Sequence, residues 1–207
     1  MQALIDNDVF AKIANYSLLS EFGALLLAKG YTPPHGRLAA APFKLKVWGK
    51  KAGTGWADVS RAQHLSAFFS SSTCAVTGPA ETTIDQLNIP KFDAGEVKLL
   101  ARALDQPASH ILTGDKNALR ALANEPALAP YAAQMAGRAI HFEMIIERLC
   151  LAHSYGMVRS AVLAAPGIDG AVYNALRNSN QALGFAALRA SIEHLRASTG
   201  TLLAKSF

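Results

Sequence analysis

The sequence predicts an α/β fold in three layers, α/β/α, with a mostly parallel central sheet and extra helices towards its C-terminal end. The first observation is a short apolar strand that ends at Asp6 and runs straight into a helix. The second is a helix over residues 93–104 that leads into an apolar strand at 109–113 and then into another helix. A helix between two strands is typical of βαβ units, which build parallel sheets.

The elements of the first half follow from periodicity and turn residues. After the strand, apolar residues recur at helical spacing, which predicts a helix capped by Asp8. Residues 31–56 are the least helical part, because the segment TPPHG is followed by alternating residues and two glycine-bearing turns. This pattern is typical of a hairpin or mobile loop. Residues 58–69 are again predicted to be helical. The apolar residues of the first helix are Val9, Ile13, Tyr16 and Leu19.

The second half is predicted to be mainly helical. Asp93 and Glu96 form a capping-box pattern at the start of the helix over 93–104. The strand SHILT at 109–113 is followed by a Thr-Gly-Asp turn and a helix, and residues 137–140 form one more short strand. Helices are expected over 142–157 and within 169–205. We expect residues 1–155 to form the domain, with a basic insertion at about 35–61, and 156–207 to be a helical extension packed on it.

Composition limits the class of protein. Of the 207 residues, 51% are hydrophobic and 17% are charged, which predicts a globular chain with a substantial core. The longest apolar run falls short of the roughly 20 residues that cross a membrane, and the N-terminal segment lacks a signal-peptide pattern. Cys74 and Cys150 are too few for a disulfide framework, so we expect buried thiols in a reducing compartment. A soluble, cytoplasmic protein is therefore expected.

The positive charge is concentrated in one stretch. The chain carries a formal net charge of +5, and residues 37–61 hold six basic residues against the single acid Asp58. Lysines neutralise phosphates and exposed tryptophans stack on bases, so the stretch predicts a single-strand nucleic-acid surface. The alternative is a hairpin with a solvated basic face and both tryptophans in the core. The residues concerned are Lys44, Lys46, Trp48, Lys50, Lys51 and Trp56.

Three acids are candidates for a metal site. Asp6 and Asp115 each follow a predicted strand, and ligands of parallel sheets bind outside the carboxyl ends of the strands. Glu96 reaches the same edge if its helix starts there. Oxygen donors of this kind favour Mg²⁺ or Mn²⁺, which can activate water for attack on phosphorus. The alternative is purely structural: Asp115 caps a helix and Glu96 completes a capping box.

Two segments carry a resemblance to a known family. LIDNDVFAKIANYSLLSEF resembles the opening of PIN-domain proteins, and FDAGEVKLLARALDQPASHILTGDKNALRAL resembles their later block. The resemblance matches Asp6, Glu96 and Asp115 to the metal-binding acids of the family, with Asn117 near a further polar position. The resemblance implies a ribonuclease that depends on Mg²⁺ or Mn²⁺ and acts on RNA. Many members of the family are toxins of toxin–antitoxin pairs, so the resemblance also implies this possible role. The family usually carries another early acid, and the segment YTPPHGRLAAAPF has none.

Two other functions remain open. A DxD pattern at Asp6 and Asp8 after an apolar strand resembles haloacid dehalogenase-like phosphatases, in which one Asp attacks phosphorus and the next transfers a proton; Asp115 would then stand in for the later metal-binding acid. The missing early acid instead favours a PIN-like protein that only binds RNA or a protein. The C-terminal helices are the expected surface for an antitoxin or a second copy of the chain. The six histidines show no metal-ligand spacing.

Overall fold

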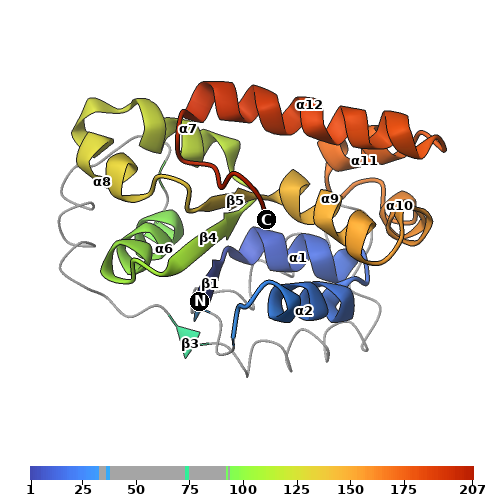
Figure 1. The fold of residues 1–207 in the computed structure, drawn as a ribbon, viewed down its shortest axis with the longest axis horizontal. Coiled ribbons are helices and arrows are strands. Elements are labelled where there is room, and N and C mark those ends of the chain that lie inside the picture. Colours follow the sequence, from blue (N-terminus) through green and yellow to red (C-terminus); the bar gives the residue numbers. More distant parts are fainter. Residues whose placement is uncertain (33–35, 38–72, 75–91, 93) are drawn as a thin grey trace.

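The fold is mixed α/β and is built on a parallel sheet (Figure 1). The computed structural model describes residues 1–32, 36–37, 73–74, 92 and 94–207. Every pairing between the five strands of the described part is parallel, in the order β3-β2-β1-β4-β5. The strands are β1 (Gln2–Ile5), β2 (Gly36–Arg37), β3 (Thr73–Cys74), β4 (Ser109–Thr113) and β5 (Ala139–His141). The sequence prediction of a mixed α/β fold with a parallel sheet is confirmed.

Helices make up most of the described chain (Figure 1). In the first half they are α1 (Asn7–Asn15), α2 (Leu19–Ala28) and α6 (Ala94–Asp105). In the second half they are α7 (Lys116–Asn124), a 3₁₀ turn at Pro126–Leu128, α8 (Ala129–Gln134), α9 (Phe142–Ala152), α10 (Tyr155–Leu163), α11 (Gly170–Leu176) and α12 (Gln181–Thr199). The hairpin expected within 31–56 and the helix expected over 58–69 lie outside the described residues, apart from the short strand β2.

The order of the strands reverses between β1 and β4. From β1 the sheet continues to β2 on one side, and β4 pairs with β1 on the other, with Leu4 opposite both Gly36 and Ile111. The direction of the winding therefore reverses at β1. In parallel sheets such a reversal opens a crevice beyond the carboxyl ends of the two strands, which is where ligands bind. Asp6 and Gly114 directly follow these two ends.

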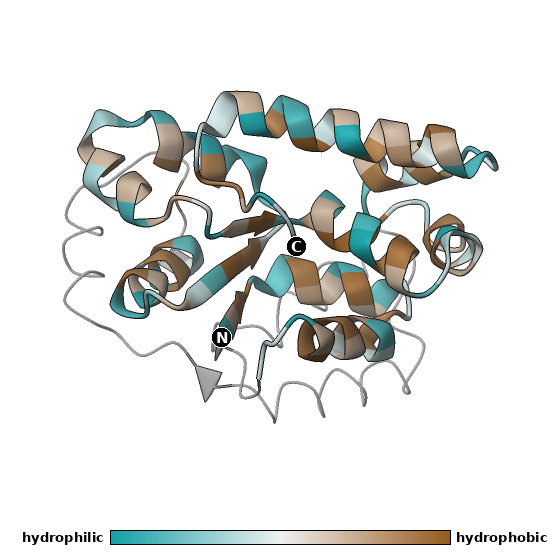
Figure 2. Ribbon diagram, in the orientation of Figure 1, coloured by the Kyte–Doolittle hydropathy of each residue, from teal (hydrophilic) through white to brown (hydrophobic). Residues whose placement is uncertain are grey.

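Apolar side chains cover both faces of the sheet. Ala3 and Ile5 of β1 belong to a cluster that includes α1 and α9, and Leu4 between them belongs to a second cluster with α6. This alternation is the period of two expected of a strand. Figure 2 shows the central strands as largely hydrophobic. The first cluster extends to Phe207, so the C-terminal helices share the core of the sheet.

Two helices predicted as continuous are each divided. Ser17 has a positive φ of 58°, which ends the first helix, and α2 begins at Leu19. The helix expected over 142–157 ends at Ala152, and α10 begins after Ser154, whose hydroxyl accepts a hydrogen bond from the Met157 amide at 3.1 Å. A serine in this position is a favoured N-cap.

The tail after α12 lies beside β5. The Ala139 amide donates to the Leu202 carbonyl at 3.0 Å, and the Ala204 amide donates to the Ala139 carbonyl at 2.8 Å. The Gly137 amide likewise donates to the Thr201 carbonyl at 2.7 Å. The tail thus pairs with the open side of β5. Within the described residues, no helix is both long and apolar enough to span a membrane.

Candidate active site

Asp6 lies between the end of β1 at Ile5 and the start of α1 at Asn7. Its backbone is extended and its side chain caps the helix, with Oδ1 accepting a hydrogen bond from the Asp8 amide at 3.3 Å. Oδ2 accepts a hydrogen bond from the Thr113 hydroxyl of β4 at 3.0 Å. The sequence prediction that Asp8 caps this helix is wrong, because the strand ends one residue before Asp6 and leaves Asp6 in the cap position. Asp8 lies in the first turn instead.

Thr113 joins the two turns that follow β1 and β4. Its hydroxyl donates to Asp6, and its oxygen accepts a hydrogen bond from the Asp115 amide at 3.0 Å. Thr113 is buried, and both bonds are partly buried. One side chain therefore fixes the turn containing Asp115 against the carboxylate of Asp6.

Asp115 caps α7. Its Oδ1 accepts hydrogen bonds from the Asn117 amide at 2.6 Å and from the Ala118 amide at 2.9 Å. Both bonds use the same oxygen, so Oδ2 is left for other partners. The side chain of Asn117 is exposed, and the contact that places it is this backbone bond to Asp115.

Glu96 lies in the first turn of α6, on the same side of the sheet as Thr113. The two residues line one small cavity of about 30 Å³ whose other walls are apolar. Thr113 therefore links the Asp6 carboxylate to the backbone of the turn that holds Asp115, and Glu96 lines the same small cavity as Thr113. The residues Lys44, Lys46, Trp48, Lys50, Lys51 and Trp56, predicted to bind nucleic acid, lie outside the described residues.

A buried lysine on α1, the helix that follows β1, contacts two acids. Lys12 of α1 is 7% exposed, and its Nζ lies 2.7 Å from Asp8 Oδ2 and 2.9 Å from Asp169 Oδ2. Burial lowers the pKa of Lys12, but the charges of the two carboxylates outweigh it and the pKa is raised overall. Gly114 packs against this group, since a Cβ there would lie 2.5 Å from Asp8 Oδ2.

A second ionic group lies at the carboxyl end of β5. Glu143 is buried, and its carboxylate contacts His141 Nδ1 and Lys116 Nζ and accepts a hydrogen bond from the Ser191 hydroxyl at 3.0 Å. The other ring nitrogen of His141 lies 3.2 Å from the Gly114 carbonyl oxygen. Burial alone would raise the pKa of Glu143, but His141 and Lys116 outweigh it and lower the pKa to about 2.

Sequence reasoning missed these two ionic groups. His141 and Glu143 could have been found, since they follow a predicted strand just as Asp6 and Asp115 do. Lys12 has the helical i, i+4 spacing to Asp8, which is a weak signal because such pairs usually lie on the surface. Asp169 belongs to a distant part of the chain, and no local pattern links it to Lys12.

The residues of the site can be compared with the ligands that a metal ion requires. Within the described residues, no three Asp, Glu, His or Cys side chains form a group able to hold one. Mg²⁺, however, keeps several waters and commonly binds to one or two protein carboxylates together with substrate phosphates. Asp6 and Asp115 fit that mode of binding, and their oxygens suit Mg²⁺ or Mn²⁺ better than Zn²⁺.

Comparison with known proteins adds no family to this description. Searches against protein-family models, curated proteins and solved structures found no match to the chain. The function is therefore argued from the site alone.

Proposed function

We propose that this protein is a metal-dependent endoribonuclease with a PIN-like α/β/α fold, in which Asp6 and Asp115 bind Mg²⁺ or Mn²⁺ and Glu96 lines the cavity beside Thr113. The observation that carries the proposal is the Thr113 hydroxyl, which links Asp6 to the Asp115 turn where the strand order reverses. This is the place at which a parallel sheet binds its ligands. Its carboxylates suit a hard cation, and the resemblance of the surrounding sequence supports the same assignment.

Each residue then has a defined task. The bound ion supplies an activated water and stabilises charge on the phosphate. Thr113 holds one oxygen of Asp6 in place. Asp115 Oδ1 is fixed by the first amides of α7, and Oδ2 is the oxygen that would bind the ion. The N-termini of α1 and α7 carry partial positive charge, which favours a phosphodiester at this edge. The basic stretch at 37–61 would bind the RNA strand.

The ion pair of Asp8 favours the nuclease over the phosphatase. A phosphatase of the DxD type needs Asp8 to give and take a proton beside Asp6. In this structure Asp8 Oδ2 is held by Lys12 at 2.7 Å, and Gly114 packs against the pair. A phosphatase would have to break this contact to use Asp8 Oδ2.

RNA cleavage is the direct test. We expect labelled RNA to be cleaved in Mn²⁺ and not in EDTA, and Asp6→Asn or Asp115→Asn to reduce cleavage by about 100-fold or more. Asp105→Asn is the matched control, because Asp105 is an exposed acid at the end of α6. RNA binding without cleavage would establish the binding protein instead, and a phospho-Asp6 formed from p-nitrophenyl phosphate would establish the phosphatase.

The toxin–antitoxin role is a further part of the proposal. Its support is the resemblance together with exposed apolar residues on the later helices, such as Leu151 and Leu183, which are 50% and 55% exposed. We expect expression of the wild-type chain to arrest growth and Asp115→Asn to relieve the arrest. Unimpaired growth with the wild type would remove this role and leave the nuclease proposal to the cleavage assay.

A further inference from the structure

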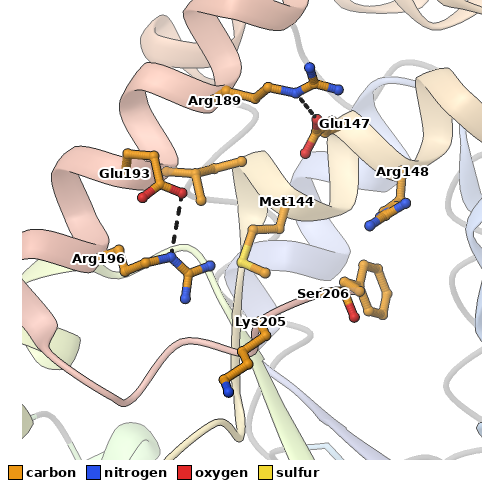
Figure 3. A pocket seen from close by; sticks show the side chains of 10 residues that line it. Met144, Glu147, Arg148, Arg189, Glu193, Arg196, Lys205 and Ser206 are labelled. Carbon is orange, nitrogen blue, oxygen red and sulfur yellow. Dashed lines mark hydrogen bonds and ion pairs between the residues drawn. The ribbon is translucent and has the colours of Figure 1, made fainter.

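A pocket lies between α9, α12 and the C-terminal tail, outside the candidate active site (Figure 3). Its volume is about 200 Å³. Met144, Ile192 and Phe207 form an apolar part of its lining, and each of them is less than 9% exposed. These apolar side chains form one wall, and the remaining lining residues are polar or charged.

Basic side chains approach this pocket from three directions. Figure 3 shows Arg148 of α9 and Arg196 of α12 on opposite sides of the pocket, and Lys205 of the tail at a third edge with its ammonium group directed away from Arg148. Arg189 also lines the pocket but is neutralised by Glu147, whose Oε1 lies 2.6 Å from Arg189 Nε. Arg196 has only a weak counter-ion, because Glu193 lies 3.5 Å away and is itself 68% exposed.

Arg148 and Lys205 lack a counter-ion: within the described part of the chain, no carboxylate lies within 4.0 Å of either group. The positive charge of Arg148 also affects the pKa of Lys29 on α2. Burial, and then the charge of Arg148, lower the pKa of Lys29. The pocket is therefore a region of uncompensated positive charge.

The pocket is also held in shape before any ligand binds. The Arg196 guanidinium donates to the Leu203 carbonyl at 3.3 Å and to the Ala204 carbonyl at 3.0 Å. Ala204 is in turn bonded to β5 through Ala139. The bonds fix the tail backbone and Arg196 to each other and to the sheet, so this part of the pocket loses little freedom when a ligand enters.

We propose that this pocket binds a terminal phosphate monoester, as carried by a mononucleotide or by the 5′ end of an RNA. A phosphate monoester carries about −1.5 to −2 charges at pH 7, which matches two uncompensated cations better than a single carboxylate does. The guanidinium of Arg148 is suited to paired hydrogen bonds with phosphate oxygens, and Lys205 supplies a mobile point charge. This inference goes beyond the proposed nuclease and does not depend on cleavage at Asp6.

Calorimetry on the full chain tests the proposal with adenosine 5′-monophosphate, adenosine, and one RNA oligonucleotide with either a 5′-phosphate or a 5′-hydroxyl. EDTA is present to prevent cleavage. We expect the phosphorylated probes to bind more tightly than their unphosphorylated partners. Binding of the mononucleotide identifies a free nucleotide as the ligand, whereas binding of the phosphorylated RNA alone identifies an RNA end.

Two variants locate the binding. Arg148→Gln and Lys205→Gln should each weaken the binding of the phosphorylated probe about 10-fold, the cost of one charge-assisted bond. Arg177→Gln, an exposed arginine at the end of α11, is the matched control and should leave binding unchanged. Lys205 is exposed, so its substitution leaves the fold intact and the test does not depend on Arg148 alone. Equal binding of phosphorylated and unphosphorylated probes, or undiminished binding by both variants, would overturn the proposal.

Discussion

The carboxylates at the ends of β1 and β4 are held differently from those that surround them. Asp6 accepts from a hydroxyl and an amide, and Asp115 accepts from two amides. Asp8 and Glu143, a few residues away along the chain or the sheet, contact the cationic side chains Lys12 and Lys116. Amide and hydroxyl donors position a carboxylate without bringing an opposite charge, whereas Lys12 and Lys116 bring a positive charge to Asp8 and Glu143.

This difference separates structural acids from candidate ligands. An acid paired with a lysine has less attraction left for a metal ion, and removal of the lysine leaves its charge without a partner, which destabilises the fold. An acid held by amide donors, as Asp115 is, is positioned by groups that carry no full charge, and it is therefore a candidate ligand. Substitutions in the pairs of acids and lysines should therefore change the free energy of unfolding strongly. Substitutions at the two helix caps, Asp6 and Asp115, should change it little.

The largest effect on stability is expected at Lys12. Replacing Lys12 by Met leaves Asp8 and Asp169 without their shared cation in a buried place, which should cost about 3–5 kcal/mol in the free energy of unfolding. Urea denaturation measures the change. The same substitution at Lys98, which is exposed on α6, is the control and should cost far less. A loss at Lys12 no larger than at Lys98 would show that the cluster does not stabilise the fold.

Lowering the pH should remove the contribution of Glu143 to the free energy of unfolding. Burial raises its pKa, but His141 and Lys116 lower it overall from the ordinary value of 4.5 to about 2. A pKa that is lower in the folded state stabilises the fold above pH 4.5, and this stability is lost as the pH falls towards 2. It is on the order of 3 kcal/mol, from about 1.4 kcal/mol for each pKa unit.

Denaturation of wild type and Glu143→Gln at several pH values checks this expectation. The difference in stability between the two should shrink steadily as the pH falls below 4.5. Glu125→Gln serves as the control, since Glu125 is exposed at the end of α7. A difference that stays constant down to pH 2 would contradict the proposed contribution of Glu143.

Thr113→Val should have an intermediate effect. Valine keeps the shape of threonine, but it removes the donor to Asp6 and the acceptor for the Asp115 amide, at a cost of about 1–2 kcal/mol. Thermal or urea unfolding measures the loss, with Thr201→Val, an exposed position, as the control. If Thr113 also positions Asp6, RNA cleavage should fall further than the loss of stability explains; unaltered cleavage would argue against that role.

The smallest effect on stability is expected for Asp115→Asn. Asparagine caps a helix about as well as aspartate, so the free energy of unfolding should change by less than about 0.5 kcal/mol, whereas Asp115→Ala should cost about 1 kcal/mol. Urea denaturation of both variants measures these changes. A stable Asp115→Asn variant that no longer cleaves RNA would separate the ligand role from the cap. Equal destabilisation by both substitutions would mean that the negative charge itself supports α7.

The elements around the site could be predicted because they depend on local patterns. Apolar strands followed by a polar turn gave β1, β4 and β5 to within about two residues, and the cap after β4 was recognised at Asp115. The break at Ser17 was missed because the apolar spacing continues across it into α2. The contacts of Lys12 with Asp169 and of Glu143 with Ser191 join distant segments, and only the packing of the later helices on the core creates them.

The pairing of the tail with β5 has a consequence for the behaviour of the chain in solution. A sheet that ends in an unpaired strand offers its amides and carbonyls to other chains and invites aggregation. Here residues 202–204 bond to Ala139 and cover part of that edge. Residues 202–204 therefore protect this edge of the sheet. A chain shortened before residue 202 would leave the edge of β5 unpaired and open to association with other copies of the chain.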